Sequence, residues 1–195
     1  MKKYNYKEIL ELVCRLYVFF FLTAYGLGKV IGAQFYTPDL IPSEIETMTI
    51  TQISDFDLAW VFMGRSYGYM LFIGLAEVIG ALLLLFNKTK LIGTLILIPI
   101  MVNVIVFDIF FLDEYGALAS AIIYLMMLLA ILWINKDKTL EVIKTLMHQS
   151  ASSKISFKDK LVKYTYILLV IAVVFVFNQL LINYLGYGKG QPSAI

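Results

Sequence analysis

Cysteine, histidine and charge are scarce in this chain. Of its 195 residues, one is cysteine, one is histidine and 15% are charged. The single cysteine, Cys14, excludes an internal disulfide and a thiolate metal cluster, and the single histidine, His148, excludes a multi-histidine metal or haem centre. The sequence also lacks the GxSxG, P-loop, GxGxxG and HExxH motifs of soluble enzymes. We therefore expect no metal site and no resident cofactor.

Apolar residues dominate instead. They make up 61% of the chain, and the mean hydropathy is +0.83, whereas soluble domains contain about 45–50% apolar residues. Five apolar runs reach the roughly 20 residues that a membrane-spanning helix needs, and none alternates with a period of two. The chain is thus predicted to be an all-α, polytopic membrane protein. The runs are Ile9–Ile31, Tyr67–Phe86, Leu91–Leu112, Tyr115–Ile134 and Tyr164–Leu185.

The charged residues alternate between the two sides of these runs. Twelve of the 16 basic residues fall before the first run, between the second and third, and between the fourth and fifth. Because cytoplasmic loops are rich in lysine and arginine, we expect a cytoplasmic N-terminus and an external C-terminus. The other side is acidic and carries Asp39, Glu44, Glu46, Asp55, Asp57, Asp113 and Glu114.

The lengths of the loops predict three parts. Short connections make consecutive runs antiparallel neighbours, so residues 1–134 are expected to form a four-helix transmembrane bundle with an external loop at 32–66. Residues 135–163 are predicted to be a cytoplasmic linker with a short amphipathic helix. Residues 164–195 are predicted to be a fifth transmembrane helix and an external tail.

Five of the polar residues inside the apolar runs form the predicted buried polar centre. A charge at the centre of a bilayer costs about 2.5–3.5 kcal/mol on the insertion scale, so each charge needs a reason. At a rise of about 1.5 Å per residue, Glu77 lies near the midplane within reach of Arg15, and Lys29 matches Asp108 in depth. Glu77 is then either a neutral buried acid or half of an ion pair. The five residues are Arg15, Lys29, Glu77, Asn103 and Asp108.

Each of the other four residues also has a simpler interpretation. Arg15 could pair with Glu11 one turn earlier, near the inner interface, with no further role. Lys29 could extend to the outer headgroups. Asn103 could hydrogen-bond between helices, and Asp108 could be an interfacial acid.

Small residues recur at helical spacing within the runs. Spacings of three or four residues between small side chains let neighbouring helices approach closely. Glu77 lies between two such glycines and should therefore point into the bundle. The predicted helix-packing residues are Gly74, Ala76, Gly80, Gly116 and Ser120.

Several motifs together resemble the DoxX-like membrane proteins, in the variant common in Bacteroidetes-type bacteria. They are Arg15, the sequence GLGK that ends at Lys29, the sequence FMG that ends at Gly64, and the block GLAEVIGALLLLFNKTKLIGTLILIPIMVNVIVFD that begins at Gly74. The resemblance covers Ile9 to Ile134 and implies a compact four-helix bundle. Members include a subunit of a thiosulfate:quinone oxidoreductase and membrane partners of soluble redox enzymes, and distant relatives are assembly factors.

Three functions are compatible with these features. We expect first a non-catalytic membrane subunit or assembly factor in the bacterial inner membrane, with the lipid bilayer and other membrane subunits as partners and no nucleic acid. On helix five, Gln179 and Asn183 suggest a pairing face. The second function is a component of a quinone-linked oxidoreductase, with quinone bound near Glu77, Arg15 or Asn103. The third is a small transporter or proton pathway, although no inverted repeat is evident.

Overall fold

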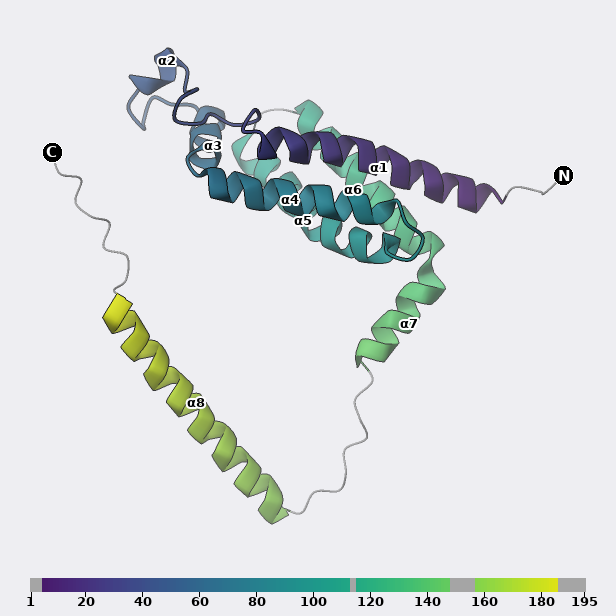
Figure 1. The fold of residues 1–195 in the computed structure, drawn as a ribbon, viewed down its shortest axis with the longest axis vertical. Coiled ribbons are helices and arrows are strands. Elements are labelled where there is room, and N and C mark those ends of the chain that lie inside the picture. The colour runs from purple at the N-terminus through teal and green to yellow at the C-terminus, as the bar shows by residue number, and fades with distance from the viewer. Residues whose placement is uncertain (1–4, 113–114, 148–156, 186–195) are drawn as a thin grey trace. The chain divides into compact units, whose positions relative to one another are not determined.

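The structure is a computed structural model that describes residues 5–112, 115–147 and 157–185. These residues form eight helices and no strand, as Figure 1 shows. The chain divides into two units near residue 147. The helices are α1 (Tyr6–Val30), α2 (Ser43–Glu46), α3 (Asp55–Gly64), α4 (Tyr67–Leu84), α5 (Lys90–Phe111), α6 (Tyr115–Ile134), α7 (Lys136–Met147) and α8 (Phe157–Leu185).

Five helices are long and apolar enough to cross a membrane: α1, α4, α5, α6 and the segment Lys160–Tyr184 of α8. The all-α class and the five apolar helices are therefore confirmed. The start of helix five is not where we expected it, because α8 begins at Phe157 rather than Tyr164. Hydropathy marks the apolar part of a helix, and α8 extends beyond that part into a segment with several lysines.

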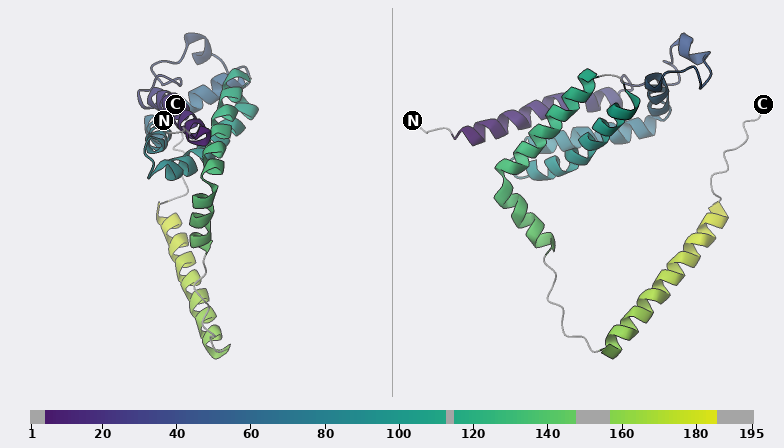
Figure 2. Two further views of the ribbon diagram at one scale, coloured as in Figure 1. Left: turned by 90° about the vertical axis from the view of Figure 1, so that its right-hand side faces the viewer. Right: turned by 180° about the vertical axis from the view of Figure 1, so that it is seen from behind.

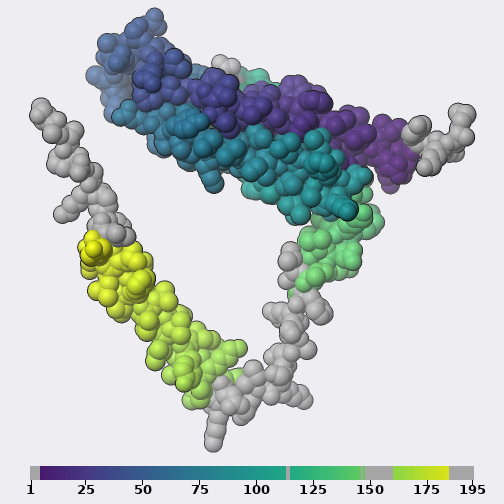
Figure 3. Space-filling view, viewed as in Figure 1, coloured from purple at the N-terminus to yellow at the C-terminus, as the bar shows by residue number. Residues whose placement is uncertain are grey.

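In the first unit, four helices pack side by side. α1 contacts α4 and α6, and α5 contacts the same two helices, so the contacts close into a ring (Figures 1 and 2). Buried side chains in the middle of the ring are apolar, among them Val18, Leu22, Leu97 and Leu128. We call these four residues the apolar layer. Figure 3 shows α1 and α4 in contact along their lengths.

Glycines set the closest helix contacts. Gly26 of α1 faces Gly74 of α4, and a Cβ atom on either residue would lie within 2.8 Å of the other's carbonyl oxygen. Gly80 of α4 faces Gly93 of α5, and a Cβ atom on Gly93 would lie 2.6 Å from the Gly80 carbonyl oxygen. Side chains larger than hydrogen would push these helices apart.

The other three predicted packing residues, Gly116, Ala76 and Ser120, are less buried than these glycines. A Cβ atom on Gly116 would meet nothing within 4 Å, so its predicted packing role is wrong. Gly116 lies in the first turn of α6 and is exposed there. Ala76 is half-buried, and Ser120 is half-buried with its hydroxyl donated to the Gly116 carbonyl at 2.9 Å.

The segment between α1 and α4 has its own structure. α1 ends at Val30, and two residues later Gly32 has a φ of 73°, in the left-handed region that favours glycine. The chain turns back there, and α3 packs against α4 and α5. At the end of α3, a Cβ atom on Gly64 would collide with the Tyr36 backbone carbonyl. Through α3, this loop therefore packs against α4 and α5 at one end of the four helices.

Two helices follow the ring. α7 matches the short amphipathic helix that was expected in the linker. In the second unit, α8 is apolar on all sides along its span, apart from a few polar residues near its end. Residues 148–156 of the expected linker, His148 included, lie outside the described residues, as do residues 186–195 of the expected tail, Asp113 and Glu114.

Candidate functional site

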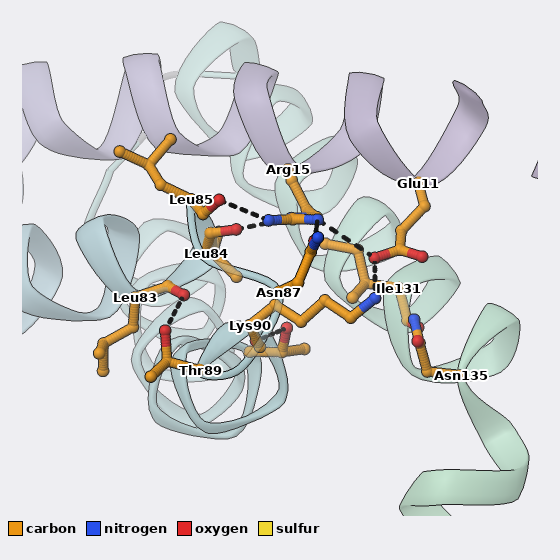
Figure 4. A network of polar contacts seen from close by, with 11 residues as sticks. Glu11, Arg15, Leu83, Leu84, Leu85, Asn87, Thr89, Lys90, Ile131 and Asn135 are labelled. Atoms are coloured by element: carbon orange, nitrogen blue, oxygen red, sulfur yellow. Dashed lines mark hydrogen bonds and ion pairs between the residues drawn. The ribbon is translucent and has the colours of Figure 1, made fainter. Parts of the chain in front are cut away.

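Buried charges gather at two places along α1, near its start and near its end. At the first place, Arg15 donates hydrogen bonds to two backbone carbonyls at the end of α4, Leu84 and Leu85, both at 2.6 Å. A third bond joins Arg15 to the Asn87 side chain at 2.7 Å. The last carbonyls of a helix have no partner within the helix, and their partial negative charge attracts a cation. Arg15 therefore closes the end of α4 (Figure 4).

Glu11 joins the same group, which we call the Arg15 cluster (Glu11, Arg15, Asn87 and Lys90). Lys90, at the start of α5, donates a hydrogen bond to Glu11 Oε1, and Arg15 Nη1 lies 3.5 Å from that oxygen (Figure 4). The three charged residues are each no more than 9% exposed. The cluster thus ties α1 to both α4 and α5.

The predicted approach of Arg15 to Glu77 is wrong. The depths estimated along the helix axes placed Glu77 within reach of Arg15. The carbonyls at the end of α4 accept the hydrogen bonds of the Arg15 guanidinium instead. Glu11 and Arg15 are the pair one turn apart that the simpler interpretation of Arg15 described.

At the other end of α1, Lys29 pairs with Glu77. The Lys29 ammonium donates to Glu77 Oε1 at 2.8 Å and to Oε2 at 2.7 Å, and the two residues are 7% and 2% exposed. Gly26 and Gly74 each lie three residues before one partner, so the close glycine contact brings the two side chains together. Lys29 and Asp108 were expected to lie at the same depth, and both line the same cavities. The hydrogen bonds of Lys29, however, go to Glu77.

Two adjoining cavities open beside this pair, with volumes of about 110 and 210 Å³. Lys29, Gln34, Glu77 and Asp108 line both cavities, and we call these four residues the Lys29 cluster. Asp108 is 4% exposed, and its carboxylate has no hydrogen-bond partner among the described residues. The Gln34 Oε1 atom is buried and also has no partner there.

Asn103 does not belong to a buried centre. It is an exposed residue of α5 that reaches only the smaller cavity. Of the five residues predicted to form one polar centre, three therefore gather at the Lys29 end, Asn103 lies at its edge, and Arg15 lies at the opposite end. The apolar layer separates the two clusters.

The two clusters differ in what they offer a ligand. In the Arg15 cluster, the charged groups are held by one another and by backbone carbonyls. In the Lys29 cluster, Asp108 and Gln34 line the cavities, and neither the Asp108 carboxylate nor Gln34 Oε1 has a hydrogen-bond partner among the described residues. Among the searched, described residues no group of three histidine, cysteine or acidic side chains is placed to hold a metal ion.

Sequence reasoning missed Asn87, Lys90 and Gln34. Lys90 had a usable signal, because it immediately precedes the third apolar run and therefore opens a helix next to a buried end. Gln34 had none, because its position depends on the turn at Gly32.

The chain has a relative in the uncharacterized protein YwoB of Bacillus subtilis (strain 168). The two are 35% identical over 126 residues, which cover 64% of this chain and 75% of the relative. No family model matches the chain, and no solved structure matches it.

Proposed function

The chain belongs to the same family as YwoB, and from that premise we propose that it is a non-catalytic integral membrane subunit or assembly factor. It works with a larger membrane or periplasmic complex in the bacterial inner membrane. The α1, α4, α5 and α6 ring is then a four-helix transmembrane bundle similar to that of DoxX-like proteins. Lysines near the start of α1 and the α4–α5 turn support a cytoplasmic N-terminus, and acids in the loop that contains α2 and α3 support an external opposite end.

The observation that carries this proposal is the composition of α8. Its span is apolar on every side, yet Gln179 and Asn183 lie one turn apart on one face. An amide without a partner is costly in hydrocarbon, and amides hydrogen-bond between membrane helices. We therefore assign this face of α8 to a helix of a partner subunit.

Purification of the tagged full chain from its own membranes in a mild detergent tests the proposal. We expect a second polypeptide in constant stoichiometry, identified by mass spectrometry and by the mass of the intact complex. The double variant Gln179→Leu with Asn183→Leu should lose this polypeptide. Thr165→Val is the matched control, because the Thr165 hydroxyl already bonds to the Leu161 carbonyl at 3.0 Å. Repeated recovery of the chain alone would contradict the proposal.

The second candidate is a membrane component of a quinone-linked oxidoreductase, for which another subunit would supply the electron carrier. One observation favours it: Glu77 and Asn103 line the same cavity. Against it, Lys29 already holds both Glu77 oxygens, and Arg15 is committed to α4. Unchanged quinone reduction in membranes that carry Glu77→Gln would remove this candidate.

A transporter or proton pathway has less support. Glu77, Asn103 and Asp108 line one cavity, but the buried apolar layer interrupts any polar path toward the Arg15 cluster. A flux assay in proteoliposomes that shows no Glu77-dependent movement would exclude it.

A further inference from the structure

The cavities of the Lys29 cluster contain more acceptors than the protein itself satisfies. Lys29 and Glu77 neutralise each other through two hydrogen bonds. Asp108 remains without a partner among the described residues, although it is 4% exposed. With ordinary side-chain charges, the three residues total one negative charge. A buried charge of this kind is costly unless a partner compensates it.

A second acceptor belongs to a residue that lines the same two cavities. Gln34 Oε1 is buried and unpartnered, and Gln34 lines both cavities, as Asp108 does. A buried acceptor left without a hydrogen bond costs about 1–3 kcal/mol. Two residues that line the same cavities thus contain oxygen atoms without a hydrogen-bond partner, which favours a ligand that donates hydrogen bonds, and the negative charge favours a cationic ligand.

Aromatic rings form much of the cavity wall. Trp60 lines both cavities, and it is held by stacking on Phe56 at 4.2 Å and by an edge contact with Phe35 at 5.3 Å between ring centroids. Tyr25 and Tyr124 line the larger cavity. The faces of such rings attract organic cations, tryptophan most strongly. The wall therefore suits a cation that also carries an apolar group.

We propose that the Lys29 cluster binds a small primary ammonium ion with an apolar substituent. Its N–H groups donate to the Asp108 carboxylate, with Gln34 Oε1 as the second acceptor, and its substituent lies against Trp60. Asp108 is the residue that determines specificity, because it supplies the buried carboxylate that has no hydrogen-bond partner among the described residues. The inference does not depend on the proposed subunit function.

Trp60 provides a direct readout. The chain has two tryptophans, and Trp133 is 76% exposed, so Trp133→Phe leaves Trp60 as the only tryptophan in a full-length protein. In phosphatidylcholine nanodiscs, n-butylammonium should change Trp60 fluorescence with a saturable curve. Butyrate, 1-butanol and tetramethylammonium should bind at least tenfold more weakly, because they lack the positive charge or the N–H donors.

Asp108→Asn in the same background keeps the shape and removes the charge. We expect its dissociation constant for n-butylammonium to rise at least tenfold. The control Asp39→Asn removes an exposed acid of the loop between α1 and α2, outside the cavity lining, and should change nothing. If Asp108→Asn fails to fold, Gln34→Met removes the second acceptor and should still weaken binding severalfold.

Several results would overturn the inference. They are an absence of saturable binding, equal binding of butyrate or 1-butanol, a response to sodium ions alone, or an unchanged affinity in Asp108→Asn. Tetramethylammonium binding as tight as n-butylammonium would likewise show that no N–H donor is recognised.

The ammonium group could come from a free amine or from an aminoethyl lipid headgroup. Phosphatidylethanolamine added to the nanodiscs distinguishes them. If the lipid is the source, it should raise the apparent dissociation constant for n-butylammonium through competition. If a free amine is the source, the added lipid should leave that constant unchanged. In Asp108→Asn, the added lipid should have no effect in either case.

Discussion

The Arg15 cluster and the Lys29 cluster lie at opposite ends of α1 and contain the same kinds of side chain. At the Arg15 end, the guanidinium has three hydrogen-bond partners besides Glu11, so the packing of α1 against α4 does not depend on any one of these bonds. At the Lys29 end, one ammonium depends on one carboxylate, and the residues that contain the unpartnered acceptors line the cavities. The several partners of Arg15 hold α1 to α4 at the first end, whereas the second end keeps oxygen acceptors without a hydrogen-bond partner.

The largest expected effect is at the less redundant end. Glu77→Ala leaves Lys29 buried without its partner, and breaking a buried ion pair from one side costs about 3–5 kcal/mol. We expect this loss in the free energy of unfolding, measured by titration with sodium dodecyl sulfate in mixed micelles and followed by circular dichroism.

A double variant separates the pair from the cavity that the substitution creates. Lys29→Met with Glu77→Leu removes both charges and keeps much of the volume, so it should be far more stable than Glu77→Ala alone. An equal or larger loss in the double variant would show that the ion pair itself is not what Glu77→Ala disrupts.

At the redundant end, Glu11→Ala should cost less. Lys90 loses a charged hydrogen bond, which is typically worth about 1.5–3 kcal/mol, but Arg15 keeps Leu84, Leu85 and Asn87. The same titration measures the loss. If Glu11→Ala proves as damaging as Glu77→Ala, the difference in redundancy between the two ends has no energetic meaning.

The glycine contact beside Lys29 should have a smaller effect. Gly26→Ala places a methyl group 2.8 Å from the Gly74 carbonyl oxygen, and overpacking of this kind costs about 1–3 kcal/mol. Gly28 is the matched control, since a Cβ atom there meets nothing within 4 Å. Gly28→Ala should stabilise α1 by about 0.5–1 kcal/mol through its helix propensity. Equal effects of the two changes would argue against close packing at Gly26.

The smallest expected effect concerns the loop between α1 and α4. Partial burial, the negative charge of Asp57 and the hydrogen bond from the Tyr36 hydroxyl to Asp57 at 3.3 Å raise the pKa of Tyr36 above its ordinary value of 10. The folded state thus holds this proton more tightly, so the associated stability is present below pH 10 and is lost as the pH rises through the folded pKa. Asp57→Asn should lower the pKa of Tyr36, measured by NMR with ¹³C-labelled tyrosine and assigned with Tyr36→Phe. An unchanged pKa would mean that Asp57 does not act on this ring.

The spanning helices could be predicted because hydropathy and length alone determine them. The inward direction of Glu77 also followed from its sequence, since Gly74 and Gly80 flank it at helical spacing. Neither inference needed to know which helix lies next to which.

The pairing of the charges could not be predicted in this way. Depth estimates place residues along an axis but do not include backbone carbonyls as competing partners, and those carbonyls take Arg15 away from Glu77. Small residues likewise mark a contact only where another helix lies opposite, which explains why Gly74 and Gly116 differ. The position of Gln34 depends on a turn outside any periodic segment.

The apolar layer gives the two ends independence. Its four residues are each at most 2% exposed. The cavities at the Lys29 end are therefore closed off by packed apolar side chains and do not continue as a polar channel to the Arg15 cluster. A membrane that holds this unit keeps its electrical insulation at that depth. We therefore expect that binding or loss of a charge at the Lys29 cluster leaves the contacts of the Arg15 cluster unchanged.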